Sequence, residues 1–340
     1  VTYPFKANPP YVTQDYNPVG HYVHEFTVPE NWKGMDIIMD FEGVESAFYL
    51  WINGKFVGYS EDSRLPAHFD ISKFLKKGKN RLAMKVFRFS DGSYLEDQDY
   101  WKYSGIERNV FIQARPKSRM NDYVLGNSLV NNYKDGNFSL YVSMLNPVKG
   151  QKVEVKVLSA AGKQLFCQSK NITSPTDTLL HFAKQFQNVQ PWNAENPYLY
   201  TLVITSTDKN GKVQESVAQP FGFRTIEMKN GQLLVNGVAI TIKGVNRQEH
   251  NAVHGRTLSI DEMVKDVKMM KQFNINAVRT SHYPNYSEWY KLCEKYGLYM
   301  VDEANIECHG ILDTEFKQLA DREDWYPAFH DRMYRMIMRD

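Results

Sequence analysis

The chain has 340 residues, of which 42% are hydrophobic and 24% charged, so it is long enough for two or three globular domains and is not a disordered polymer. Its 41 basic and 39 acidic residues nearly cancel and form no basic run, which argues against nucleic acid and anionic membranes as partners. No stretch is long and apolar enough to span a bilayer, and the three irregularly spaced cysteines imply no disulfide framework.

Residues 1–117 are expected to form an all-β domain. Short alternating runs separated by turn signals are typical of a sandwich of jelly-roll type. Asn53-Gly54, between two such runs, predicts a tight hairpin. The expected strands are 20–28, 36–41, 47–52 and 81–87. No helix longer than about three turns is expected before residue 110.

An acidic loop, residues 90–101, interrupts this pattern. It carries four acidic groups and ends on Trp101. One reading is a solvated acidic turn. The other is a loop that reaches a binding site, where carboxylate oxygens would bind sugar hydroxyls or a cation.

Residues 118–224 form a second all-β stretch. The expected strands 153–157 and 199–204, with a hairpin tip at 208–212, fit an immunoglobulin-like sandwich. No cluster of chemically active side chains is found here, and we expect a spacer domain.

From residue 225 the pattern changes to alternating strands and helices. A hairpin is expected at 233–238, and Ser259, with Glu262 three residues on, predicts a helix start by its capping-box spacing. Gly297 predicts the end of the next helix. The expected strands are 239–244, 276–280 and 298–301, and the expected helices are 259–274, 287–296 and 327–340. Strands that alternate with helices indicate parallel βα units, whose active sites lie at the carboxyl ends of the strands.

Polar side chains gather just after each of these three strands. They are Asn246, Arg247, Glu249 and His250 after the first, Ser281 and His282 after the second, and Asp302, Glu303, Glu307 and His309 after the third. In an extended segment Glu307 and His309 point the same way, so they form either a hydrogen-bonded pair or part of a divalent-cation site. Between them, Cys308 is interpreted as a small filler residue, with a nucleophilic thiol as the alternative.

Three segments carry a resemblance to a known family. Residues 244–247, 279–285 and 301–310 resemble glycoside hydrolases of the family-2 type, and Asn-Ile-Glu-x-His-Gly at 305–310 is similar to the large bacterial β-galactosidases. The resemblance extends over the whole chain. It implies a mainly β multidomain protein, with a jelly-roll sugar-binding sandwich at 1–117, an immunoglobulin-like sandwich at 118–224 and the first βα units of a (β/α)8 TIM barrel at 225–340.

The resemblance also implies roles for individual residues. Asp99 matches a residue that contacts both the substrate and a Na⁺ or K⁺ ion, and Asn17 and His282 match further sugar contacts. Gln248 stands where relatives carry a sugar-contacting histidine. Glu307 and His309 match ligands of a Mg²⁺ ion.

The activity that the resemblance implies is hydrolysis of terminal β-D-galactosides, such as lactose, with retention by two glutamates. A full barrel needs roughly 250 residues, and only about 115 follow Thr225. We therefore expect both catalytic glutamates beyond Asp340 and no catalytic residue within these 340 positions. The resemblance further implies a homo-oligomer. The sequence does not decide between the cytoplasm and the periplasm of a bacterium. The alternatives are a carbohydrate-binding protein without hydrolytic activity, or a related β-glucuronidase or β-mannosidase.

Overall fold

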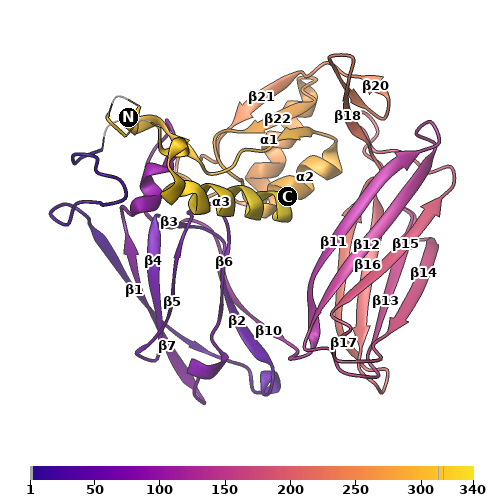
Figure 1. The fold of residues 1–340 in the computed structure, drawn as a ribbon, viewed down its shortest axis with the longest axis horizontal. Helices are drawn as coiled ribbons and strands as arrows, with labels where there is room; N and C mark the ends of the chain where they lie inside the picture. The colour runs from indigo at the N-terminus through magenta and orange to yellow at the C-terminus, as the bar shows by residue number, and fades with distance from the viewer. Residues whose placement is uncertain (1–2, 313, 317) are drawn as a thin grey trace.

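The structure is a computed structural model that describes residues 3–312, 314–316 and 318–340. Two β-sandwiches stand side by side, and a segment of strands and helices lies above them (Figure 1). The last helix crosses the top of the first sandwich. Within the described ranges, no helix has the length and apolar character needed to cross a membrane.

The first sandwich packs a four-stranded sheet, ordered β1-β7-β4-β5, on a three-stranded sheet, ordered β10-β2-β6. Every pairing is antiparallel, and Asn53 and Gly54 form the β4–β5 turn with positive φ angles of 53° and 78°. Alternate side chains of these strands fill one apolar core. The strands are β1 Val19–Thr27, β2 Asp36–Phe41, β4 Ala47–Ile52, β5 Lys55–Glu61, β6 Ala67–Asp70, β7 Lys79–Phe87 and β10 Val110–Arg115.

The loops of this sandwich hold only short elements. Strands β3 (Val44–Glu45) and β9 (Gly105–Ile106) pair with each other, and the acidic loop contains strand β8 (Glu96–Asp97). Between residues 3 and 110, the helices are 3-10 turns of three or four residues, so the described part of this domain holds no long helix, as expected. They are η1 Glu30–Trp32, η2 Ser72–Phe74 and η3 Asp91–Tyr94.

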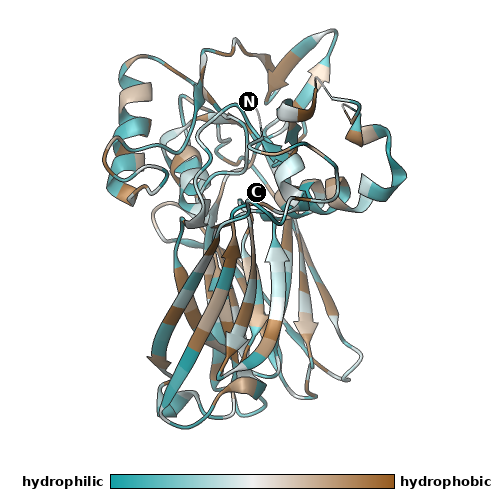
Figure 2. Ribbon diagram, turned by 90° about the vertical axis from the view of Figure 1, so that its left-hand side faces the viewer, coloured by the Kyte–Doolittle hydropathy of each residue, from teal (hydrophilic) through white to brown (hydrophobic). Residues whose placement is uncertain are grey.

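The second sandwich packs sheet β11-β12-β15 on sheet β14-β13-β16-β17, as expected for an immunoglobulin-like domain. Bands of hydrophobic and hydrophilic residues alternate along the strands of the sandwiches (Figure 2), because one face of each strand meets the core. Phe138, Phe182 and Val155 are fully buried there. The strands are β11 Arg119–Val130, β12 Asp135–Leu145, β13 Lys152–Leu158, β14 Gln164–Asn171, β15 Leu179–Phe186, β16 Tyr200–Thr207 and β17 Val213–Phe221.

The third segment begins with a small antiparallel sheet and continues as parallel βα units. Strands β18 (Ile226–Lys229), β19 (Gln232–Val235) and β20 (Val238–Ala239) form the small sheet. Strands β21, β22 and β23 then pair in parallel, as predicted. Their bounds, with those of the two helices between them, are β21 Gly244–Arg247, α1 Ile260–Gln272, β22 Ala277–Thr280, α2 Ser287–Tyr296 and β23 Tyr299–Val301.

Local capping explains where the two helices begin and end. The Ser259 hydroxyl accepts a hydrogen bond from the backbone of Glu262, whose carboxylate accepts one from the backbone of Ser259 in return. Gly297 ends α2 in the left-handed conformation at φ 77°. A Cβ atom at Gly297 would also lie 2.4 Å from the carbonyl oxygen of Ala194, in the second sandwich. Both helix boundaries are as the sequence predicted.

The first parallel strand differs from its prediction. Residues 239–244 were expected to form it, but the strand runs from Gly244 to Arg247. Ala239 belongs to the preceding hairpin, and the side chain of Asn276 bonds the backbone of both Thr241 and Lys243, which are exposed. Asn246 and Arg247 therefore lie within the strand rather than after it.

After β23 the chain returns to the first sandwich. Strand β24 (Glu307–Cys308) is followed by helical turns η4 (His309–Ile311), η5 (Leu319–Asp321) and η6 (Glu323–Trp325) and by helix α3 (Tyr326–Arg339). Ile311, Leu319 and Trp325 pack with Tyr94 and Leu95 of the first sandwich in one buried cluster.

Candidate active site

The carboxyl ends of the three parallel strands present the polar side chains that the sequence singled out. Strands β21, β22 and β23 end at Arg247, Thr280 and Val301. The Thr280 hydroxyl donates to the carboxylate of Asp302 at 2.9 Å and accepts from the backbone of Glu303 at 3.0 Å. The end of β22 therefore fixes the chain that follows β23.

Two histidines and two glutamates form a row at this edge. Glu303 accepts hydrogen bonds from the Arg279 guanidinium and from Nδ1 of His282, the latter at 3.0 Å. The Glu307 carboxylate lies 4.0 Å from His282 Nδ1 and 3.6 Å from His309 Nδ1. The structure thus brings together three of the predicted site residues, His282, Glu307 and His309.

Glu307 and His309 could supply two of the ligands of a hard cation. Both distances from the Glu307 carboxylate exceed hydrogen-bond length, so its oxygens are not held by these histidines. Mg²⁺ favours carboxylate oxygens and usually keeps several waters. Within the described residues, no group of three His, Cys, Asp or Glu side chains is arranged to hold a metal. The pair fits a site in which the chain supplies two ligands.

The acidic loop of the first sandwich reaches the barrel edge. Strand β8 pairs in parallel with β24, with Glu96 opposite Glu307. Asp99 is exposed and lines an open depression of about 520 Å³ together with Tyr100, Trp101, Gln248 and His250. Two predicted substrate residues, Asp99 and Gln248, therefore share one depression although they are distant in sequence.

Asn17 is held differently. Its side-chain amide donates to the carbonyl of Phe89 at 2.9 Å and accepts from the amide of Phe89 at 3.0 Å. These bonds anchor the start of the acidic loop. The structure does not bring Asn17 into the row or among the residues that line the depression, and its role in sugar binding stays a prediction.

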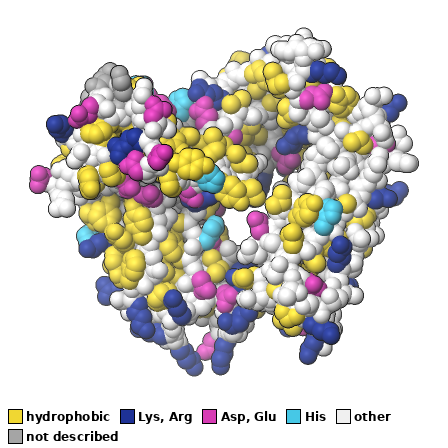
Figure 3. Space-filling model, in the orientation of Figure 1, with side chains coloured by type: hydrophobic (Ala, Val, Ile, Leu, Met, Phe, Trp, Pro, Cys, Tyr) yellow, Lys and Arg dark blue, Asp and Glu magenta, His cyan; other side chains and the backbone are white. Residues whose placement is uncertain are grey.

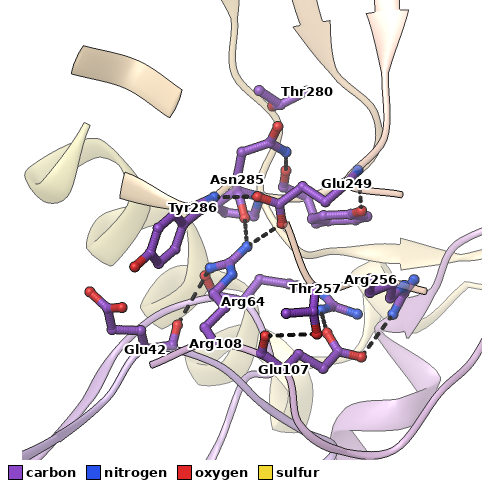
Figure 4. Close-up of polar contacts among 12 residues, drawn as sticks. Glu42, Arg64, Glu107, Arg108, Glu249, Arg256, Thr257, Thr280, Asn285 and Tyr286 are labelled. Atoms are coloured by element: carbon purple, nitrogen blue, oxygen red, sulfur yellow. Dashed lines mark hydrogen bonds and ion pairs between the residues drawn. The ribbon is translucent and has the colours of Figure 1, made fainter. Parts of the chain in front are cut away.

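A buried cluster of opposite charges joins the first sandwich to the barrel (Figure 4). Arg108 bonds the Glu249 carboxylate at 2.7 Å, with both side chains only 6% exposed. Burial alone would raise the pKa of Glu249, but the guanidinium groups of Arg108 and Arg247 hold that pKa below its ordinary value. Arg64 and Arg256 both pair with Glu45 in the same cluster.

Cys308 is not an activated nucleophile in this structure. Burial, more than any neighbouring charge, raises the pKa of its thiol to about 11. A thiol with that pKa is neutral at pH 7, whereas the thiolate is the reactive form. The side chain packs beside the buried cluster of Tyr94 and Leu95, as expected of a filler residue.

The sequence did not identify the residues that hold the site in place. Gln98 and Asn305 form a buried amide pair at 2.7 Å, and Arg108 forms the buried ion pair described above. Gln98 lies in the acidic loop and Asn305 within the 301–310 motif, but amides give no charge signal of their own. Only the fold shows that they meet.

Comparison with known proteins accounts for all three parts of the chain. Residues 1–116 match the profile described as "Glycosyl hydrolases family 2, sugar binding domain", and residues 118–224 match "Glycosyl hydrolases family 2". Residues 226–340 match "Glycosyl hydrolases family 2, TIM barrel domain". The chain belongs to glycosyl hydrolase family 2. The mainly β fold of the family, with its two sandwiches and the start of a barrel, is the one expected from the sequence.

Among the family-2 relatives, the chain is 42% identical to a protein named beta-galactosidase from Priestia megaterium, over 356 residues. It is 43% identical to one from Alteromonas mediterranea, over 355 residues. Both alignments cover 100% of this chain but only 34% and 33% of the relatives. The chain therefore spans about a third of the length of the curated relatives that it matches.

Solved family-2 structures have the same fold. A β-glucuronidase from Ruminococcus gnavus matches 96% of this chain with a TM-score of 0.82 at 24% identity, over 56% of its own length. The Bifidobacterium dentium β-glucuronidase has the same TM-score at 21% identity, covering 94% of this chain and 57% of its own. At such identities the likeness shows the fold alone.

Proposed function

We propose that this chain is the N-terminal part of a longer β-galactosidase that hydrolyses terminal β-D-galactosides, such as lactose, with retention of configuration. The observation that carries the proposal is the row of His282, Glu303, Glu307 and His309 at the strand ends, facing the first sandwich. The identity to proteins named β-galactosidase, over the whole chain, supports this substrate class.

In this proposal the chain binds and orients the sugar. Nδ1 of His282 faces Glu303, so Nε2 is the ring nitrogen that would face a sugar hydroxyl. Asp99 and Gln248 would bond other hydroxyls from the walls of the depression. Hydrogen bonds of this kind, where they strengthen in the transition state, supply several kcal/mol to glycoside hydrolysis.

The acid and the nucleophile are proposed to come from outside these 340 residues. Retaining hydrolysis needs two carboxyl groups about 5 Å apart across the scissile bond. Glu303 is engaged by Arg279 and His282. Glu307, with His309, is proposed to hold Mg²⁺, and Asp99 to contact Na⁺ or K⁺. A bound Mg²⁺ would supply positive charge at the Glu307–His309 edge of the site.

The test is a substrate panel on the complete protein encoded by the reading frame to which this chain belongs. Chromogenic β-galactoside, β-glucuronide and β-mannoside would be compared at matched concentrations. We expect kcat/KM for the galactoside to exceed the other two by about a hundredfold or more, because a site built to bond a hydroxyl discriminates strongly. Preference for the glucuronide or mannoside would reassign the substrate. Galactoside binding without turnover would leave a carbohydrate-binding protein.

A further inference from the structure

The segment that carries Glu307 and His309 is held by the acidic loop of the first sandwich. The amide of Glu307 donates to the carbonyl of Leu95 at 2.6 Å. Three residues on, the amide of Gly310 donates to the carboxylate of Asp97. These bonds extend the parallel pairing of β8 with β24, so the backbone on both sides of His309 is tied to the sandwich.

A buried pair of amides holds the start of the same segment. Nε2 of Gln98 donates to Oδ1 of Asn305 at 2.7 Å, and Nδ2 of Asn305 donates to Oδ1 of Asp62 at 2.9 Å. The exposed fractions are 4% for Gln98, 1% for Asn305 and 4% for Asp62. Burying an amide away from water costs free energy unless the amide is hydrogen-bonded. The arrangement in which both side-chain amides are bonded is therefore strongly preferred.

The same glutamine also faces the strand end that carries His282. Its Nε2 lies 3.5 Å from the backbone carbonyl of His282. Gln98 thus lies between the two segments whose side chains form the row. The Glu307 carboxylate, two residues beyond Asn305, lies 4.0 Å from His282 Nδ1, and this spacing depends on how the two backbones are held.

We propose that Gln98 is a positioning residue of the site. Through its buried bond to Asn305 it holds the segment with Glu307 and His309 at a fixed distance from His282. It does so from the first sandwich, without contacting sugar or metal itself. The inference deepens the proposed function and rests on it, since the side chains it positions are those proposed to bind Mg²⁺ and substrate.

The test replaces Gln98 by Met in the complete protein and compares it with Gln151→Met. Gln151 is the matched control, because it is also 4% exposed and its side-chain oxygen also accepts buried bonds, from Ser118 Oγ and the amide of Val148, both at 2.7 Å. It lies in the second sandwich, away from the row. Both changes keep the side-chain length and remove an amide, so both lower the melting temperature.

Two measurements distinguish positioning from general stability. Amide hydrogen exchange of peptides that cover 303–310 is expected to accelerate about tenfold or more in Gln98→Met and to stay unchanged in Gln151→Met. Calorimetric titration with Mg²⁺ is expected to give an affinity about tenfold weaker for Gln98→Met alone, as is usual when a residue that supports metal ligands is lost. If Gln98→Met fails to fold, the experiment uses Gln98→Asn instead. The shorter side chain keeps an amide group but does not reach Asn305.

Equal exchange of peptides 303–310 in the two variants would overturn the proposal. This outcome is separate from failure of the proposed function, since exchange needs neither Mg²⁺ nor substrate. A wild-type protein that cleaves no galactoside would contradict the function, and the exchange comparison would still decide whether Gln98 positions the segment.

Discussion

Glu307 and Glu303 have the same side chain but different surroundings. Glu303 is bonded by Arg279 and His282, whereas the Glu307 oxygens lie beyond hydrogen-bond distance of the two nearby imidazoles. Of the two carboxylates, Glu307 is therefore the one that we propose as the ligand of a cation.

Replacing Glu307 by Gln in the complete protein should raise the Mg²⁺ concentration for half-maximal activity by about tenfold or more, because a neutral amide oxygen is a weaker ligand for a hard cation. The measurement is activity against Mg²⁺ concentration. Glu154→Gln, in the second sandwich, is the control and should leave the curve in place. An unshifted curve for Glu307→Gln would mean that the ion, if it is used, lies elsewhere.

Glu61, in strand β5, provides a test of electrostatics in the first sandwich. Burial, and then repulsion from the Asp91 carboxylate, raise the pKa of Glu61 to about 7. Since its unfolded value is lower, folding favours the protonated form. Glu61 therefore supports the fold at low pH, and that contribution is lost as the pH rises through about 7.

Glu61→Gln should thus raise the melting temperature at pH 8 and have little effect at pH 5. The measurement is thermal unfolding of both proteins at the two pH values. Glu25 is a control of opposite sign, because a hydrogen bond from Lys79 lowers its pKa, so Glu25→Gln should not stabilise the protein at pH 8. Equal shifts of Glu61→Gln at both pH values would contradict the assignment.

At the scale of elements, helix ends and pairing direction could be predicted, while one strand could not. The Ser259 capping box and the left-handed Gly297 are local signals, so α1 begins and α2 ends where the sequence predicts. Residues 239–244 alternate like a strand, but tertiary bonds from the Asn276 side chain override that pattern. β-propensity depends on such context more than helix propensity does.

Part of the site could likewise be predicted from the sequence, and part could not. His282, Glu307 and His309 follow strands whose order is legible in the sequence, and the structure brings them together. The Gln98–Asn305 contact joins residues that are 207 positions apart. Neither amide has a charge or periodicity that identifies its partner, so only the packed domains reveal it.

Outside the interface, the first sandwich exposes aromatic side chains on its four-stranded sheet. Hydrophobic residues gather over β1, β4 and β5 (Figure 3). Tyr49, Phe56 and Tyr59 are among the exposed residues of this face, and the Tyr49 ring contacts each of the other two rings. By contrast, the interface between the first sandwich and the barrel buries charged side chains.

The Arg108–Glu249 pair is an enclosed ion pair across that interface. Removing one partner of a buried pair leaves an unpaired charge and costs about 3–5 kcal/mol. We expect Arg108→Met and Glu249→Gln each to lower the free energy of unfolding by that order. The double variant should cost clearly less than the sum, since the second change removes the charge that the first left unpaired.

The measurement is urea unfolding of the four proteins. The control is the exposed pair of Lys79 and Glu25, whose side chains are 78% and 58% exposed. Lys79→Met should change the free energy of unfolding by less than about 1 kcal/mol. Strict additivity of the Arg108 and Glu249 changes would show that the two residues do not stabilise the interface together.

At the scale of the whole molecule, the first sandwich and the barrel segment line one depression together. The acidic loop places Asp99 in the same depression as Gln248, and strand β8 pairs with β24 of the third segment. The second sandwich stands beside the first and contacts the barrel through Trp192, which donates to the carbonyl of Glu294 at 2.8 Å. Its role as a spacer stays a prediction.

The proposed sugar site spans the first sandwich and the barrel. The decisive measurement is kcat/KM for a chromogenic β-galactoside of the complete protein with Asp99→Asn. Asp261→Asn, an exposed aspartate in the first turn of α1, is the control. We expect Asp99→Asn to lower kcat/KM by about a hundredfold, equivalent to loss of a charged hydrogen bond to the sugar, with the melting temperature unchanged. A kcat/KM equal to that of the Asp261→Asn control would show that the acidic loop is ordinary surface and that the site lies in the barrel alone.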